Sequence, residues 1–339
     1  MATAESAVIY LEQGATLTAY EEMTDSTDHK TFTNDAPVWS GKGGYAPVIR
    51  PDGIYQGSRV VSTCAVNDNV SVASFKAYSS GVSYTVSADA AFPITRPAGN
   101  VAKVCSITMN NAGALVEIAG TDSATPAFSE TRGAAGGPPL IPVGSVEVGQ
   151  VRMTTSAAGL ITSSEIYQTV GQHSERSDFP TWTINNIGEG IASDTAAEEN
   201  AYVEFASVLP LSHTGPTCKP VYAQYYEPTF GELAKALDFT PAETTHSVSS
   251  KQFYNGNIGS RTSSLGQGGF TAILDDGVTD TLIADKNEVL TVKFFPDRNK
   301  SAYILTQGAI GVSRTFPVGD QIQASVTISS DTASAEFSG

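Results

Sequence analysis

The stretch Gln321-Ile-Gln-Ala-Ser-Val-Thr-Ile-Ser329, close to the end of the chain, alternates polar and apolar residues at every position. Side chains of a β-strand point to opposite faces in turn, so the apolar residues of this stretch are predicted to face a core. The other face carries hydroxyl and amide groups. A strand face turned to bulk solvent usually carries charge. The pattern therefore indicates a surface that packs against other copies of the chain or lines a passage.

Strand-like segments separated by turn residues fill most of the remaining chain. This spacing predicts a mainly β protein, a β-sandwich or barrel with one or two short helices and an additional β domain. Asn110-Asn-Ala-Gly113, between two strand-like segments, predicts a hairpin turn. The glycines of Gly256-Asn-Ile-Gly259 are expected in a turn, because the flanks are strands and no phosphate-binding Lys follows.

Two short helices are expected in the C-terminal third. Thr229 and Glu232 have the spacing of a capping box, and Leu233 and Leu237 follow at helical spacing. The segment 276–285 predicts the second helix, with Val278 and Leu282 turned inward.

The 339 residues exceed one typical core. We expect residues 1–47 to form an N-terminal strand and an acidic loop that belong with residues 215–339, the core domain. Residues 48–214 would form the additional β domain. The border is placed at Leu211-Ser-His-Thr-Gly-Pro216 because of its turn chemistry.

Charge excludes several partners. Only 16% of the residues are charged, below the roughly 25% of ordinary soluble domains, and the formal net charge is −16. Tight nucleic-acid binding needs clustered Lys and Arg, and no segment is basic. No apolar run approaches the roughly 18 residues of a membrane span. The first residues lack the pattern of a signal peptide, so synthesis as a soluble protein in the cytoplasm is expected.

The residue types of catalytic and metal sites are present but scattered. Cys64, Cys105 and Cys218 are odd in number and far apart, which favours free thiols. The four histidines show no metal-ligand spacing, and no serine-nucleophile elbow exists. Acidic residues near Asp276 do not match a calcium loop. We therefore expect no enzyme activity, no cofactor and no metal, although a pair of carboxylates for glycan hydrolysis can come from any two strands.

The C-terminal third carries a family resemblance. Residues 270–295 are predicted as strand, short helix and strand, and Gln307-Gly-Ala-Ile-Gly-Val-Ser-Arg-Thr-Phe-Pro-Val-Gly-Asp320 leads into the closing strand. This order resembles the tail tube (major tail) proteins of long-tailed bacteriophages with non-contractile tails. The resemblance covers residues 215–339 and the N-terminal 40.

The resemblance implies a structural virion protein located in the tail. Its copies would form rings, commonly hexameric, that stack into a tube through which DNA passes during ejection without specific binding. Besides other copies of itself, the expected partners are the tape measure, tail terminator and tail tip proteins. The alternative is a capsid decoration or host-attachment β-module.

Two sets of residues follow from this interpretation. An acidic or neutral inner wall lets DNA slide, whereas a basic wall would hold it, so we expect the assembled inner surface to be net negative. The candidates that face this lumen are Glu288, Thr291, Gln323, Ser325 and Thr327. An arm that bridges stacked rings is expected in the acidic loop, with candidates Glu21, Glu22, Asp25, Asp28, Asp35 and Trp39.

Overall fold

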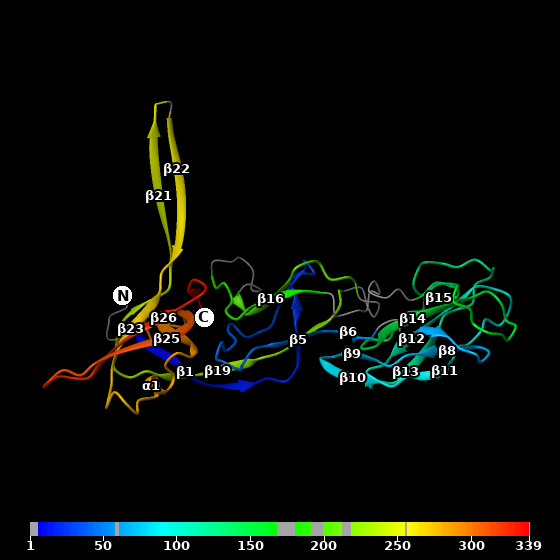
Figure 1. The fold of residues 1–339 in the computed structure, drawn as a ribbon, viewed down its shortest axis with the longest axis horizontal. Coiled ribbons are helices and arrows are strands. Elements are labelled where there is room, and N and C mark those ends of the chain that lie inside the picture. Colours follow the sequence, from blue (N-terminus) through cyan, green and yellow to red (C-terminus); the bar gives the residue numbers. More distant parts are fainter. Residues whose placement is uncertain are drawn as a thin grey trace.

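The computed structural model describes residues 6–57, 61–167, 180–191, 199–211, 218–254 and 256–338. Within these residues the regular structure is almost entirely antiparallel β-strand, with α1 (Thr281–Ala284) as the one short helix. The predicted mainly β class is confirmed. Figure 1 shows an elongated arrangement in which a large sheet, a linking unit and a third body follow one another. No helix in the described part of the chain is long and apolar enough to cross a membrane.

The largest sheet, called the main sheet, joins the first strand of the chain to strands of its last third. β1 lies between β19 and β24, and β27 pairs with β25 beside the main path. The strands in spatial order are β19 (Tyr226–Glu232), β1 (Val8–Leu17), β24 (Val289–Phe295), β25 (Tyr303–Thr315), β26 (Gln323–Ser329), β23 (Gly268–Ile273) and β20 (Ala236–Thr240), with β27 (Ala335–Phe337) added.

The main sheet has one apolar face and one face that is covered only in part. Leu290, Val292, Ile310 and Val326 are buried together on the apolar face, where Leu282 of α1 joins them. Across the opposite face, near β1, the segment 36–44 crosses the sheet. Val38 of this segment packs there in a second buried cluster, with Leu305, Ala335 and Phe337.

A buried carboxylate fixes the crossing segment to the sheet. The β1–β24 pairing ends at Leu11, and the next residue, Glu12, is 1% exposed. Its carboxylate accepts the Thr291 amide at 2.9 Å and also the Ser40 hydroxyl. Gln307 donates to the Trp39 carbonyl at 2.8 Å and to Thr291 Oγ1 at 2.9 Å. This network satisfies polar groups that burial would otherwise leave unpaired.

A linking unit of two small sheets holds a second core. Phe32, Trp39, Phe205, Val221 and Tyr225 are buried in it. Its sheets are β2 (Glu21–Glu22), β18 (Val221–Gln224) and β5 (Val48–Pro51), and β16 (Trp182–Asn185), β17 (Tyr202–Phe205), β4 (Thr31–Thr33) and β3 (Thr24–Asp25).

The third body, called the distal unit, has its own core and lies at the end of the molecule away from the main sheet (Figure 1). Its sheets are β10 (Val82–Val86), β9 (Phe75–Ser79) and β6 (Gly53–Gln56); β11 (Asp89–Pro93), β8 (Asn69–Val72) and β7 (Val61–Thr63); and β13 (Leu115–Ala119), β12 (Lys103–Met109), β14 (Val146–Met153) and β15 (Ile166–Tyr167). The predicted hairpin at 110–113 is confirmed, since β12 and β13 pair across it.

The linking unit combines segments that the sequence divided among three domains. β16 and β17 were assigned to 48–214, yet β17 pairs with β4 and packs in the same core as Val221. Most of the predicted border at 211–216 lies outside the described residues.

The helix predicted over Thr229–Leu237 is wrong. Residues 226–232 form β19 and pair with Tyr10–Leu17 of β1, and residues 236–240 form β20. The backbone turns between them at Lys235, which has φ 61. The ladder to β1 supplies hydrogen bonds that outweigh the local helix signal, and Pro228 is tolerated because β19 is an edge strand. In the second predicted helix, α1, Leu282 is buried as expected, whereas Val278 is exposed.

Replacing Glu12 tests the buried network. Glu12→Ala leaves the Thr291 amide and the Ser40 hydroxyl without this acceptor, so we expect the free energy of unfolding to fall by about 3 kcal/mol. Glu12→Gln keeps one acceptor oxygen and should lose clearly less. Urea unfolding followed by tryptophan fluorescence measures both, because Trp39 lies beside this network. Equal losses in the two variants would contradict the assignment.

Candidate assembly surface

The uncovered part of the main sheet is an open face of hydroxyl and amide groups. On β26, Gln323, Ser325 and Thr327 are exposed while Ala324 and Val326 between them are buried. On the neighbouring strands, Thr271 and Ser313 pair with Ser325 and Thr315 pairs with Gln323, whereas Ile273, which also pairs with Gln323, is apolar. This polar face consists of Thr271, Ser313, Thr315, Gln323, Ser325 and Thr327.

The polar face is free of charged side chains at its register positions on β23, β25 and β26. Gly311 lies opposite Thr327, and a Cβ atom built at Gly311 would come within 2.4 Å of Thr327 Oγ1. The absence of a side chain at Gly311 therefore leaves room for the Thr327 hydroxyl on the sheet. The predicted alternation of the closing strand is confirmed, and three of the five lumen candidates lie on one exposed face.

The other two lumen candidates lie elsewhere. Thr291 is fully buried beneath the 36–44 segment, in contact with Glu12 and Gln307, so its assignment to an open face is wrong. Glu288 is half-buried, with Oε2 3.5 Å from a Cβ built at Gly43. The sequence could not reveal that a segment 250 residues earlier in the chain covers this part of the sheet.

Lys293, which follows Thr291 on the same face, does not reach the polar face. Its Nζ lies 3.7 Å from the centroid of the Tyr303 ring, and burial lowers its pKa. The positive charge is held against aromatic rings by a cation–π contact.

A long hairpin projects from the main sheet (Figure 1). Among the described residues, β21 (Thr244–Phe253) and β22 (Gly256–Leu265) pair only with each other. Hydroxyl pairs join the strands across one face: Ser247 to Thr262 at 2.6 Å and Ser249 to Ser260 at 2.7 Å. Apart from half-buried Leu265, its described side chains are exposed.

The hairpin differs from the rest of the chain in charge. Residues 244–265 contain Lys251 and Arg261 and no acidic residue, in a chain of net charge −16. The expected turn at Gly256–Gly259 is wrong, because these residues belong to β22 and pair with β21 from Gly256 onward. The Ser and Thr residues of 244–250 were the sequence signal that could have indicated a strand extending over the whole of β21.

Exposed apolar side chains lie at the loop between β25 and β26. Phe316 and Val318 of this loop are exposed, and so is Val278 on the neighbouring 274–280 loop. A Cβ built at Gly277 would come within 2.8 Å of the Phe316 ring, which places the two loops together. Exposed apolar groups that gather in this way favour a protein contact.

The acidic loop does not form a free arm. Glu21 and Glu22 belong to β2, which pairs with β18, and their carboxylates accept hydrogen bonds from Tyr225 and Tyr222 at 3.3 Å. Trp39 is 0% exposed and stacks on Tyr225 at a centroid distance of 5.0 Å. The arm assignment is therefore wrong for Trp39, whose ring completes the core of the linking unit.

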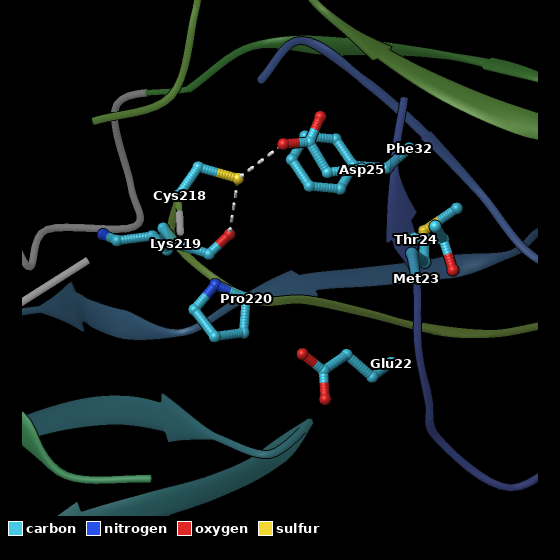
Figure 2. Close-up of a pocket in the computed structure, with 8 residues that line it drawn as sticks. All are labelled: Glu22, Met23, Thr24, Asp25, Phe32, Cys218, Lys219 and Pro220. Atoms are coloured by element: carbon cyan, nitrogen blue, oxygen red, sulfur yellow. Dashed lines mark hydrogen bonds between the residues drawn. The ribbon is translucent and has the colours of Figure 1, made fainter. Parts of the chain in front are cut away.

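The remaining arm candidates lie at the edge of the linking unit. Asp28 and Asp35 are exposed, and Asp28 accepts the amides of Lys30 and Thr31 within its own turn. Asp25 lines a pocket of about 420 Å³ together with Cys218 (Figure 2). Its carboxylate also contacts His29. His173 and His213 lie outside the described residues.

A comparison with protein-family models finds no match, and a comparison with curated proteins finds none either.

Neighbouring residues of β26 provide a matched test of the two faces. Val326→Ala removes two buried methyl groups, so we expect it to lower the free energy of unfolding by roughly 2 kcal/mol. Ser325→Ala should change it by less than about 0.5 kcal/mol because the side chain is exposed. Chemical unfolding of both variants measures the difference. A larger loss for Ser325→Ala would mean that this face is covered within the single chain.

Proposed function

We propose that this chain is a structural virion protein whose copies form rings stacked into a hollow tail tube through which DNA passes. The observation that carries the proposal is the projecting hairpin β21–β22, which has no partner strand among the described residues. It leaves the same sheet that carries the uncharged polar face. The role proposed for the chain is mechanical rather than catalytic.

The hairpin is built to be completed by another molecule. An isolated two-stranded hairpin is marginally stable in water, and its outer edges expose unpaired backbone groups. Docking on a neighbour supplies both burial and hydrogen bonds. Its two basic residues complement an acidic surface, and the rest of this chain is acidic. A second copy is therefore the occupant that its charge favours.

A contact between the hairpin of one copy and a different surface of the next copy can produce a ring. A hairpin that docks on a different surface of the next copy makes a head-to-tail contact, which closes into a ring when the rotation permits. The exposed apolar loops at Phe316 and Val278 supply a second contact of the same kind. The number of copies in the ring, commonly six in the family that the sequence resembles, belongs to the proposal.

The polar face suits the wall of a DNA passage. DNA carries about one charge per 1.7 Å, and basic groups that displace its counterions bind it. Gln323, Ser325 and Thr327 offer no such groups. Passing DNA would therefore meet hydroxyls and amides that form exchangeable hydrogen bonds with water, and it would slide rather than adhere.

The distal unit fits the outside of such a tube. It has its own core and lies away from the main sheet (Figure 1), so it can project outward without disturbing the wall. Contacts with tape measure, tail terminator and tail tip proteins would then fall on the main sheet and on the ends of the tube.

Electron microscopy of the purified chain tests the proposal. We expect rings or hollow tubes from the full chain at high concentration. A variant in which Asn-Gly replaces residues 244–265 should stay monomeric, because the hairpin is gone. The deletion should leave the main sheet intact, because the Gly266 amide donates to the Glu243 carbonyl at 2.8 Å and so holds the two ends of the deleted segment together.

Charge variants of the hairpin serve as matched controls. Exchange of the two basic residues, Lys251→Arg with Arg261→Lys, should preserve assembly, whereas Lys251→Glu with Arg261→Glu should slow it. A full chain that remains monomeric at every concentration would overturn the proposal. That result would instead favour a decoration or host-attachment module.

The uncharged wall has its own test. Gln323→Lys, Ser325→Lys and Thr327→Lys together place three positive charges on the polar face of each copy, so assembled tubes should retain double-stranded DNA in a salt-dependent way. Tubes of the unchanged chain should release it. Co-sedimentation at two salt concentrations measures retention, and equal release by both tubes would show that this face lies away from the lumen.

A further inference from the structure

Three ligand-type side chains far apart in the sequence meet at the linking unit. Asp25 ends β3, His29 lies in the turn to β4, and Cys218 precedes β18. One ligand atom from each lies within 4.8 Å of the others. Figure 2 shows the Cys218 thiol directed at the Asp25 carboxylate, at the edge of the pocket.

The turn that contains His29 has an unusual backbone conformation that hydrogen bonds stabilise. Thr27 and His29 have φ values of 73 and 56, a left-handed backbone that costs free energy for residues other than glycine. The His29 amide donates to Asp25 Oδ1 at 2.9 Å, and its carbonyl accepts the Leu209 amide at 2.8 Å. These two backbone hydrogen bonds fix the position of His29 next to Asp25.

A single oxygen is shared at the centre of the cluster. Asp25 Oδ2 lies 2.5 Å from His29 Nδ1 and accepts the Cys218 thiol at 3.3 Å. Burial, with Asp25 as the next contribution, raises the pKa of Cys218 to about 12. Without a cation, the thiol therefore keeps its proton and donates it to the carboxylate.

We propose that Asp25, His29 and Cys218 bind a divalent transition-metal ion of the zinc type. Thiolate, imidazole and carboxylate are the ligands of zinc, whereas calcium and magnesium take oxygen ligands. On binding, the Cys218 sulfur exchanges its proton for the ion, and the proton passes to solvent. The imidazole binds in its neutral form through Nδ1, and no electron is transferred.

The three side chains could reach tetrahedral zinc geometry through small movements. Zinc bonds of about 2.0–2.3 Å place tetrahedral ligand atoms roughly 3.3–3.6 Å apart. The thiol and carboxylate already have nearly this separation, and the imidazole–carboxylate contact would lengthen as the ion enters. A solvent molecule from the adjacent pocket completes the coordination. The ammonium of Lys219 points away from the thiol in Figure 2.

The ion would join two strands that connect the main sheet to the rest of the molecule. Asp25 and His29 lie on the outgoing segment after β1, and Cys218 lies on the returning segment before β18. The bound ion would therefore cross-link two segments of the linking unit, and this proposal does not depend on the proposed assembly.

Cobalt titration of the full-length chain tests the site. The chelator-treated, reduced protein is titrated with Co²⁺ without oxygen. We expect one ion per chain, with a thiolate-to-cobalt charge-transfer band and strong tetrahedral d–d bands, both removed by added Zn²⁺. Cys218→Ser should abolish the charge-transfer band, and Asp25→Asn or His29→Asn should weaken binding at least about tenfold.

Matched controls use the same residue types elsewhere. Cys64→Ser and His246→Asn should leave the spectrum and the affinity unchanged, because Cys64 lies on the distal unit and His246 on the hairpin. A band that vanishes in Cys64→Ser, or no charge-transfer band in the unchanged chain, would overturn the proposal. If Cys218→Ser does not fold, as judged by circular dichroism, the Asp25 and His29 variants decide.

The pH dependence gives an independent measurement. Because the Cys218 thiol releases one proton for each ion bound, the apparent affinity should rise as the pH is raised from 7 to 8. Zn²⁺ should also raise the melting temperature of the unchanged chain and of Cys64→Ser, but not of Cys218→Ser. An affinity that is independent of pH would exclude the thiolate as a ligand.

Discussion

The insertion of β1 between β19 and β24 is the constraint on which the rest of the structure depends. It brings the first strand of the chain into the interior of a sheet whose other strands come from the last third. The chain therefore leaves the main sheet after Leu17 and rejoins it as a strand at Tyr226. The linking and distal units are the consequence, and Glu12 fixes the point where the chain crosses back over the sheet.

The main sheet divides its surface by chemistry. Apolar residues fill one face, and the 36–44 segment covers the β1 side of the other. What remains open is a face without charge and a hairpin without acidic residues. Both features are costly in a free monomer, since the open face lacks the usual charged residues and the hairpin has unpaired edges. Both become favourable when copies associate, and this coupling is the physical basis of the proposed tube.

Strictly local patterns were predicted well from the sequence. The alternation over 321–329 predicted which residues of β26 are buried, and the turn residues Asn110-Asn-Ala-Gly113 predicted a hairpin, because both signals depend on neighbours within a few residues. The helix predicted at Thr229 failed for the converse reason. Its capping signal is local, but the competing ladder to β1 comes from more than 200 residues away.

The candidate site was predictable only where burial could be inferred from the strand itself. Ser325 and Thr327 are exposed because their own strand alternates, whereas Thr291 is buried by a distant segment that the sequence pattern of β24 does not reveal. Trp39 was misplaced in the same way, since its stacking partner Tyr225 lies in another segment. Long-range contacts of this kind leave no spacing in the sequence.

The cluster of Asp25, His29 and Cys218 shows why such contacts matter for function. Cys218 follows Asp25 by 193 positions, so no ligand spacing could be recognised. Yet these residues lie together on the outgoing and returning segments that connect the main sheet to the linking unit. In the proposed tube, the proposed metal–thiolate bond would hold these two segments together with a single cysteine, for which a disulfide would need two.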